Sequence, residues 1–201
     1  YENITIKGGM NSHVVVDPAY AFVLNFVNCT NITIENLTMG HTEEGYCTGG
    51  VIGLTNSSAI TIRSCDMYGC GAYGIVSQDS PFLMEKSIIR DCSYGIMQLF
   101  GVKHAEFNEC DFFRNREFSM VEIDGNSSSI QFNNCRFAQN QGVLFAVDTD
   151  IEIRNSEIHH PTADGFGSEN NILIDEATGV FVDNKPLEDR GIGPKRGYSA
   201  Y

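Results

Sequence analysis

The sequence predicts an all-β fold: a single-stranded, right-handed parallel β-helix of about eight coils, closed by a C-terminal capping strand and tail. Three observations predict it. An apolar pair with one intervening residue recurs along the chain, residues at fixed offsets from each pair match between repeats, and no stretch sustains the 3.6-residue period of a helix. Crossovers between parallel strands are almost always right-handed, and this sets the expected hand.

The recurring apolar pair marks the start of each predicted coil. The pairs begin at Ile4, Ile32, Ile60, Phe82, Ala105, Ile130, Ile151 and Ile172. Successive starts are 28, 28, 22, 23, 25, 21 and 21 residues apart. A period that drifts in this way is expected of stacked coils joined by loops of different lengths. A second apolar segment precedes most new coils, so each coil should hold at least two short strands.

Small residues stand mostly five positions after each start, and large apolar residues stand seven positions after it. The small column reads Gly9, Leu37, Cys65, Ser87, Cys110, Cys135, Ser156 and Ala177. The large column reads Asn11, Met39, Met67, Ile89, Phe112, Phe137, Ile158 and Gly179. We expect the cysteines of the small column to pack inside as compact hydrophobes.

Ten positions after four of the starts stand Cys70, Cys92, Asn115 and Asn140. Asparagine side chains stacked at a tight turn can bond the amide of the next coil, which predicts a ladder there. A disulfide between Cys70 and Cys92 is the minor alternative, because stacked side chains point in parallel directions.

Residues 1–179 are expected to form the repeats and residues 180–201 a cap and tail, since the segment 179–187 has the pattern of a short strand and a turn. No cap precedes Tyr1, so we expect an N-terminally truncated β-helix that belongs to a longer chain with other domains.

Composition excludes two classes of function. The chain of 201 residues has 13 Lys and Arg against 26 Asp and Glu, a formal charge of −13, which argues against a nucleic-acid surface. No apolar run approaches the ~20 residues of a membrane span.

The repeat resembles that of the pectate-lyase-like superfamily, as in residues 31–36 (Asn-Ile-Thr-Ile-Glu-Asn) and 59–65 (Ala-Ile-Thr-Ile-Arg-Ser-Cys). The resemblance implies a polysaccharide or oligosaccharide as partner and an extracellular or cell-surface setting for a secreted protein. The motifs of the polygalacturonase branch are absent, because Gly40-His41-Thr42 lacks the second glycine, Thr5-Ile6-Lys7 lacks the arginine, and no Asp-Asp occurs. If the chain is an enzyme, the resemblance leaves polysaccharide lyase and glycoside hydrolase as the classes.

In the resembling enzymes a groove runs over the outward face of one sheet. Three positions after each start, the outward column reads Lys7, Glu35, Arg63, Glu85, Asn108, Asn133, Arg154 and Asp175. Alternating charges of this kind form a stabilising ladder, or a polar track in which Arg63 or Arg154 grips a uronate carboxylate. Tyr46, in the long insertion 40–50, together with Tyr68 or Tyr73, could stack on a sugar ring at the wall of that groove.

A second candidate site is acidic. Glu122, Asp124, Asp148 and Asp150 fall near the later coils and precede His159, His160 and Asp164. Such carboxylates could hold Ca²⁺, or could act as the acid and base of a glycosidase. The insertion 40–50 has metal-ligand chemistry in His41, Glu43, Glu44 and Cys47, but four zinc ligands are not supplied.

We therefore expect a carbohydrate-directed domain that binds an extended polysaccharide along a sheet-face groove, and the sequence leaves open whether it also processes the polymer. The alternative is a non-catalytic structural or adhesin module of a larger surface or phage-type protein.

Overall fold

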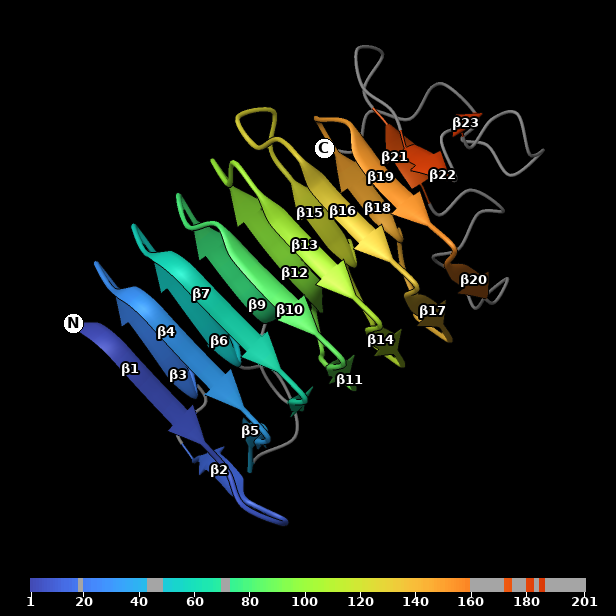
Figure 1. Ribbon diagram of the computed structural model, residues 1–201. Coiled ribbons are helices and arrows are strands. Elements are labelled where there is room, and N and C mark those ends of the chain that lie inside the picture. The colour runs from blue at the N-terminus through green and yellow to red at the C-terminus, as the bar shows by residue number, and fades with distance from the viewer. Residues whose placement is uncertain are drawn as a thin grey trace.

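The computed structural model describes residues 1–17, 20–42, 49–69 and 73–159, together with the backbone of three short strands between residues 172 and 186 (Figure 1). These residues contain 23 strands and no helix, and hence no helix able to span a membrane. The strands form three sheets that run side by side along the molecule, so the predicted all-β architecture is confirmed.

Each sheet takes one strand from every coil. Sheet A contains β1 (Glu2–Lys7), β4 (Thr30–Glu35), β7 (Ser58–Arg63), β10 (Phe82–Glu85), β13 (Ala105–Asn108), β16 (Ile130–Asn133), β19 (Ile151–Arg154), β22 (Val180–Val182) and β23 (Lys185–Pro186). Sheet B contains β2 (His13–Val16), β5 (Thr38–His41), β8 (Asp66–Tyr68), β11 (Ile88–Arg90), β14 (Asp111–Phe113), β17 (Arg136–Ala138) and β20 (Glu157–His159). Sheet C contains β3 (Leu24–Val27), β6 (Ile52–Thr55), β9 (Tyr73–Gln78), β12 (Gly95–Phe100), β15 (Val121–Ile123), β18 (Phe145–Val147) and β21 (Ile172–Ile174). A coil is one circuit through sheets A, B and C.

The strands from β1 to β21 make seven circuits through the three sheets, so the prediction of about eight coils is too high. The pair at Ile172 is not a coil start. It lies in β21, which pairs with β18 in sheet C, whereas the next strand of sheet A is β22, which pairs with β19. Strands of sheets A and C share the same alternating apolar pattern, and only the pairing partner tells them apart.

At its C-terminal end the chain reverses, because β22 and β23 pair antiparallel. A short strand and turn were predicted in this segment. The boundary at residue 179 and the capping role of residues 180–201 stay predictions, since most of that segment lies outside the described residues.

Side chains of successive coils stack in register in the core. From the second coil to the seventh, the predicted large column pairs along sheet B, for example Met39 with Met67 and Phe112 with Phe137. Its first member is wrong: Val14, not Asn11, pairs with Met39, because the first coil has five residues between sheets A and B where the later coils have two. The Phe112 and Phe137 rings stack with centroids 4.8 Å apart.

The small columns have the predicted structural roles. Cys65, Cys110 and Cys135 are at most 2% exposed, and each thiol lies against a carbonyl oxygen of the previous coil. Cys92 is a free thiol, so the minor disulfide alternative does not form.

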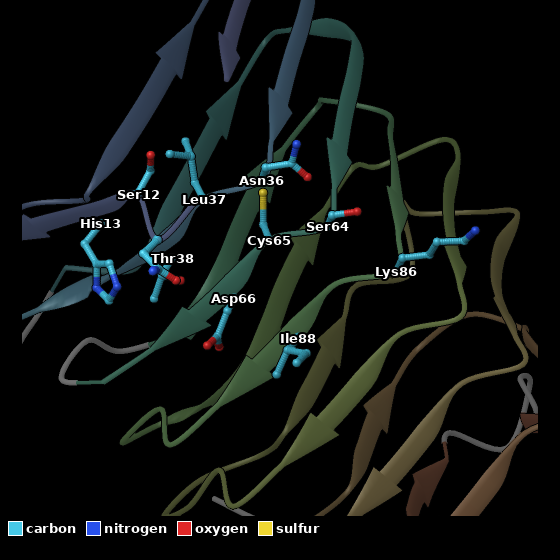
Figure 2. Close-up of a pocket in the computed structure, with 11 residues that line it drawn as sticks. Ser12, His13, Asn36, Leu37, Thr38, Ser64, Cys65, Asp66, Lys86 and Ile88 are labelled. Carbon is cyan, nitrogen blue, oxygen red and sulfur yellow. The ribbon is translucent and has the colours of Figure 1, made fainter. Parts of the chain in front are cut away.

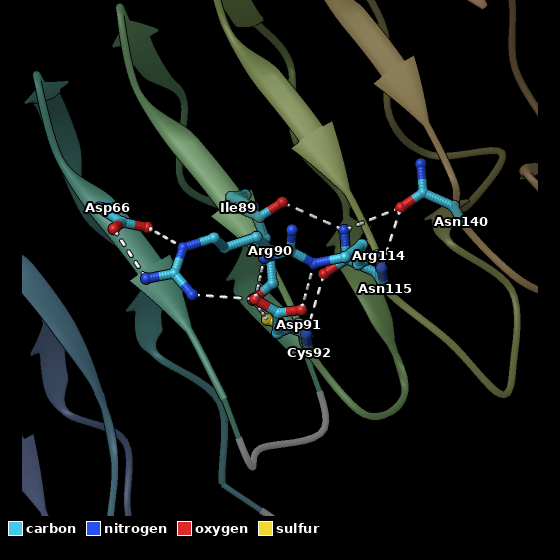
Figure 3. Close-up of polar contacts among 8 residues, drawn as sticks. All are labelled: Asp66, Ile89, Arg90, Asp91, Cys92, Arg114, Asn115 and Asn140. Carbon is cyan, nitrogen blue, oxygen red and sulfur yellow. Dashed lines mark hydrogen bonds and ion pairs between the residues drawn. The ribbon is translucent and has the colours of Figure 1, made fainter. Parts of the chain in front are cut away.

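The predicted asparagine ladder is present. The Oδ1 atom of Asn115 accepts the Cys92 N–H at 3.0 Å, and the Oδ1 atom of Asn140 accepts the Asn115 N–H at 3.1 Å (Figure 3). Both asparagines are fully buried, so the ladder satisfies backbone groups that water cannot reach.

Candidate functional site

Connections of variable length flank sheet C on both of its edges. The chain passes from sheet A to sheet B by two residues in every coil from the second to the seventh. In the first six coils it passes from sheet B to sheet C by four to ten residues, and from sheet C to sheet A by two to six. Binding residues concentrate on loops held by a rigid scaffold. Sheet C is therefore the sheet whose outer face is flanked on both edges by connections of variable length.

The outer face of sheet C is nearly free of charge. One outward column runs through Asn25, Gly53, Val76, Gln98, Glu122 and Ala146. A second runs through Val27, Thr55, Gln78 and Phe100. Glu122 is the one ionisable side chain in these two columns.

Both carboxylate oxygens of Glu122 are held by neighbours from earlier coils. Gln98 Nε2 donates to Oε2 at 2.5 Å, and the Tyr73 hydroxyl donates to Oε1 at 3.0 Å. Burial raises the pKa of Tyr73, and the negative charge of Glu122 raises it further. Tyr73 therefore stays a neutral donor that fixes the direction of the carboxylate.

A glycine makes room for this arrangement. A Cβ atom on Gly95 would lie 2.7 Å from Tyr73 Cε1 and 2.5 Å from the carbonyl oxygen of Ser119. Because Gly95 has no side chain, the Tyr73 ring can lie across the next coil and reach Glu122.

A pocket of about 330 Å³ opens beside Glu122. It is lined by Tyr73, Glu117, Phe118, Ser119, Glu122, Gly142 and Val143. Phe118 is 55% exposed, and its ring packs on Tyr94 with centroids 5.0 Å apart. The pocket thus combines two carboxylates, a tyrosine hydroxyl and an exposed aromatic ring, a set that can bind a sugar and exchange protons with it.

Of the four predicted acidic residues, only Glu122 lines this pocket. Asp124 belongs to the turn after β15, where it accepts hydrogen bonds from Gly101 N at 2.9 Å and Ser127 Oγ at 2.7 Å. Burial raises the pKa of Asp124, but these hydrogen bonds outweigh it and hold the pKa below its ordinary value. Asp148 and Asp150 are exposed after β18.

Within the described part of the chain, no three His, Cys, Asp or Glu side chains gather to hold a metal. Ca²⁺ binding by the predicted carboxylates stays a prediction, and the side chains of His159, His160 and Asp164 lie outside the described part. Tyr46 and the other predicted residues of the loop 43–48 lie outside it as well. His41 is buried at the end of β5, where its Nε2–H donates to the Ala21 carbonyl at 2.7 Å.

In the predicted outward column of sheet A, side chains of neighbouring coils form ion pairs with one another. Lys7 Nζ lies 2.5 Å from Glu35 Oε1, and Arg63 Nε lies 3.5 Å from Glu85 Oε2. These are the stacked pairs expected of a charge ladder.

The same column continues with a neutral contact and a further ion pair. Asn133 Nδ2 donates to Asn108 Oδ1 at 3.0 Å, and Arg154 binds Glu152 on its own strand at 2.6 Å. The described side chains of this column that were predicted to bind substrate are thus brought into line, but they are occupied by neighbours within sheet A. Their role in binding stays a prediction.

Sheet B carries a similar network (Figure 3). Arg90 binds both oxygens of Asp66 at 2.9 Å, lies over the Tyr68 ring, and also reaches Asp91. Arg114 binds both oxygens of Asp91 at 2.8 Å. The Arg114 hydrogen bond is the chief reason why the pKa of Asp91 lies below its ordinary value.

Sequence reasoning missed Gln98, Glu117 and Phe118, and it gave Tyr73 a stacking role rather than a bond to Glu122. Their contacts cross from coil to coil, so no local motif contains them. The available signal was indirect: Glu117 and Phe118 lie in the seven-residue connection 114–120, one of the longer ones.

Residues 21–184 match the protein family described as "Right handed beta helix region", and the chain belongs to that family. A capsule K1-specific depolymerase of Klebsiella phage K64-1 is 26% identical to it over 147 residues, which cover 67% of this chain and 16% of the depolymerase. The match therefore spans about a sixth of the phage protein. The crystal structure of the Agl-KA catalytic domain aligns with 90% of this chain and 42% of that domain, at 12% identity and a TM-score of 0.43.

Proposed function

We propose that this chain is the polysaccharide-binding β-helix of a larger, surface-acting protein, and that the outer face of sheet C holds the sugar. The observation that carries the proposal is the pocket beside Glu122, where Glu117, Tyr73 and the exposed Phe118 ring meet. The relation to a phage capsule depolymerase supports a bacterial capsular polysaccharide as the ligand.

Sheet C is favoured over sheet A because its polar groups are less occupied. On sheet A, the charged side chains pair along the column, so a sugar would have to break existing ion pairs. On sheet C, the amides of Asn25 and Gln78 are exposed, and Glu122 is held in place by uncharged partners. A sugar hydroxyl can therefore be bound there at a lower desolvation cost.

The pocket also supports cleavage of the bound polymer. Hydrolysis of a glycosidic bond uses one carboxylic acid to protonate the leaving oxygen and a second carboxylate as base or nucleophile. We assign these two roles jointly to Glu117 and Glu122, with Tyr73 and Gln98 as positioning residues for Glu122. Water supplies the atoms that replace the broken bond, so no cofactor is needed.

Binding is tested by isothermal titration with capsular polysaccharides that contain uronates and with neutral ones. We expect Glu122→Gln to weaken binding at least tenfold and Glu85→Gln, a matched change on sheet A, to leave it unchanged. The reverse result would move the binding face to sheet A, and no binding by the unmodified chain to any polysaccharide would contradict the proposal.

Cleavage is tested separately by release of reducing ends. Glu117→Gln should abolish release while the polymer still binds, because the amide keeps the shape of the side chain but can act neither as acid nor as base. Release that persists in both Glu117→Gln and Glu122→Gln would contradict the assignment.

The self-paired faces of sheets A and B favour a second candidate function, a structural module that spaces other domains. Charges satisfied by one another resist new partners and stiffen the coils. This candidate predicts that Glu122→Gln changes neither binding nor cleavage.

A further inference from the structure

Besides the pocket beside Glu122, the structure has a second one, which we call the corner hollow. It lies along the edge of sheet B that faces sheet A, away from the connections between sheets B and C. It follows the corner between sheets A and B through the first four coils and has a volume of about 320 Å³ (Figure 2). It is lined by Asn11, Ser12, His13, Asn36, Leu37, Thr38, Ser64, Cys65, Asp66, Lys86 and Ile88.

The two-residue corners give the hollow its shape. Asn36, Ser64 and Lys86 each open the corner of their coil with a positive φ, at 57°, 52° and 47°. All three side chains are exposed, whereas the residue that follows each of them is buried. Leu37 and Cys65 therefore form the floor, and the exposed side chains form one wall.

The longer connection of the first coil closes one end. A Cβ atom on Gly8 would lie 2.1 Å from the carbonyl oxygen of Asn36, so this segment presses directly on the corner of the second coil. The Thr38 N–H donates to the Ser12 carbonyl at 3.0 Å, and Ser12 Oγ accepts the Gly9 N–H at 2.8 Å. These bonds pin the end wall in place, so the hollow is formed before any ligand binds.

The uncharged side chains of the hollow have hydrogen-bonding capacity to spare. Where the structure is described, the side chains of Asn36, Thr38 and Ser64 make no hydrogen bond within the protein. The polar side chains of sheets A and B, in contrast, are mostly bound to one another. An amide and two hydroxyls that face one hollow can donate to and accept from the hydroxyls of a sugar.

Two charged side chains of the hollow, Asp66 and Lys86, differ in how firmly their ion-pair partners hold them. Asp66 is held by two hydrogen bonds from Arg90, which leaves it little freedom. The Lys86 ammonium is 4.0 Å from Glu109, a long separation for an ion pair, so it can turn toward a ligand. The hollow therefore offers neutral donors and acceptors along its length and one adaptable cation at its far end.

We propose that this corner hollow is a second saccharide subsite, which takes a short glycan segment by its hydroxyl groups. The inference rests on the proposed function, since it supposes that the chain meets polysaccharide. It adds a contact on another edge of the same rod, and two weak contacts on one polymer give a higher overall affinity than either alone.

The test uses the ¹⁵N-labelled full chain titrated with two probes, cellohexaose as a neutral glycan and hexagalacturonate as an acidic one. Backbone amide shifts are followed at Ser12, Thr38 and Ser64 for the hollow, and at Gln98 and Glu122 for sheet C. The double variant Asn36→Gly and Ser64→Gly removes two side chains of the hollow while glycine keeps the positive φ of both corners. Asn134→Gly is the matched control, because Asn134 has the same corner conformation (φ 54°) outside the hollow.

We expect at least one probe to shift the hollow amides, with an affinity at least tenfold weaker in the double variant and unchanged in Asn134→Gly. A shift with hexagalacturonate alone assigns Lys86 to a carboxylate and still supports the subsite. Absence of shifts at the hollow with both probes, or equal affinities in the double variant and the control, overturns it. Failure of the proposed function appears elsewhere, as an absence of shifts at Gln98 and Glu122.

Discussion

Replacement of Asn115 by alanine should destabilise the fold strongly, although the residue lines neither of the two pockets. Its side chain is fully buried, accepts the Cys92 N–H at 3.0 Å, and donates to the carbonyl of Ile89 at 3.1 Å and to Asn140 Oδ1 at 3.0 Å. A net contribution of about 1 kcal/mol per hydrogen bond gives a loss of about 3 kcal/mol. The buried Cys92 N–H left without an acceptor is the largest part of that loss.

The assay is urea unfolding followed by far-ultraviolet circular dichroism, with Asn133→Ala as the control. Asn133 is half-buried on sheet A and donates to Asn108 at 3.0 Å, so its loss should cost less than about 1 kcal/mol. Asn115→Asp keeps the shape of the side chain but removes both donations, and it should be at least as destabilising as alanine at pH 7. A cost for Asn115→Ala below about 1 kcal/mol, or equal to that of the control, would refute the ladder as a source of stability.

Three further predictions concern titratable groups. Burial raises the pKa of Tyr73 above its ordinary 10.0, so the stabilising effect of the neutral hydroxyl is present below pH 10 and is lost as the pH rises further. Between about pH 8 and 11 the urea midpoint of unfolding should therefore fall less in Tyr73→Phe than in the unmodified chain. The hydrogen bond from Arg114 lowers the pKa of Asp91, so the stabilising effect of the Asp91 carboxylate is present above about pH 4 and is lost as the pH falls. In Asp91→Asn the urea midpoint should fall less with acid than in the unmodified chain, and an equal fall in both would contradict the role of this hydrogen bond. Burial raises the pKa of Cys92 to about 12, so iodoacetamide at pH 8 should leave its peptide unmodified unless urea is present, as read by mass spectrometry.

The fold could be predicted from sequence because every coil repeats the same physical requirement. Met39 and Met67, or Asn115 and Asn140, match because each lies directly on its counterpart in the next coil. The count of coils could not be predicted as well. The pair at Ile172 fits the pattern of sheet A and belongs to sheet C, and a two-residue alternation cannot distinguish two sheets that face the same core.

The candidate site was only partly predictable, for a related reason. Glu122 was found because carboxylates stand out in a chain of mostly neutral repeats. Its hydrogen bond to Tyr73 was missed because Tyr73 reaches it across Gly95, so the contact links three coils. The sheet A column was preferred on sequence because its charges align, and that same alignment lets Lys7 and Glu35 bind each other.

From the second coil on, the corner between sheets A and B always has two residues, whereas the connections on either side of sheet C vary in length. We call the constant corners with their strands the spine, and the variable connections the margin. An inserted peptide between Phe113 and Val121 would project from the margin, while the same insert between Asn36 and Leu37 would push one rung of sheet B off its neighbours. The connections of the margin can thus change in length and sequence during evolution while the stacked strands of the spine stay the same. For protein engineers, the margin is the place to graft new recognition loops.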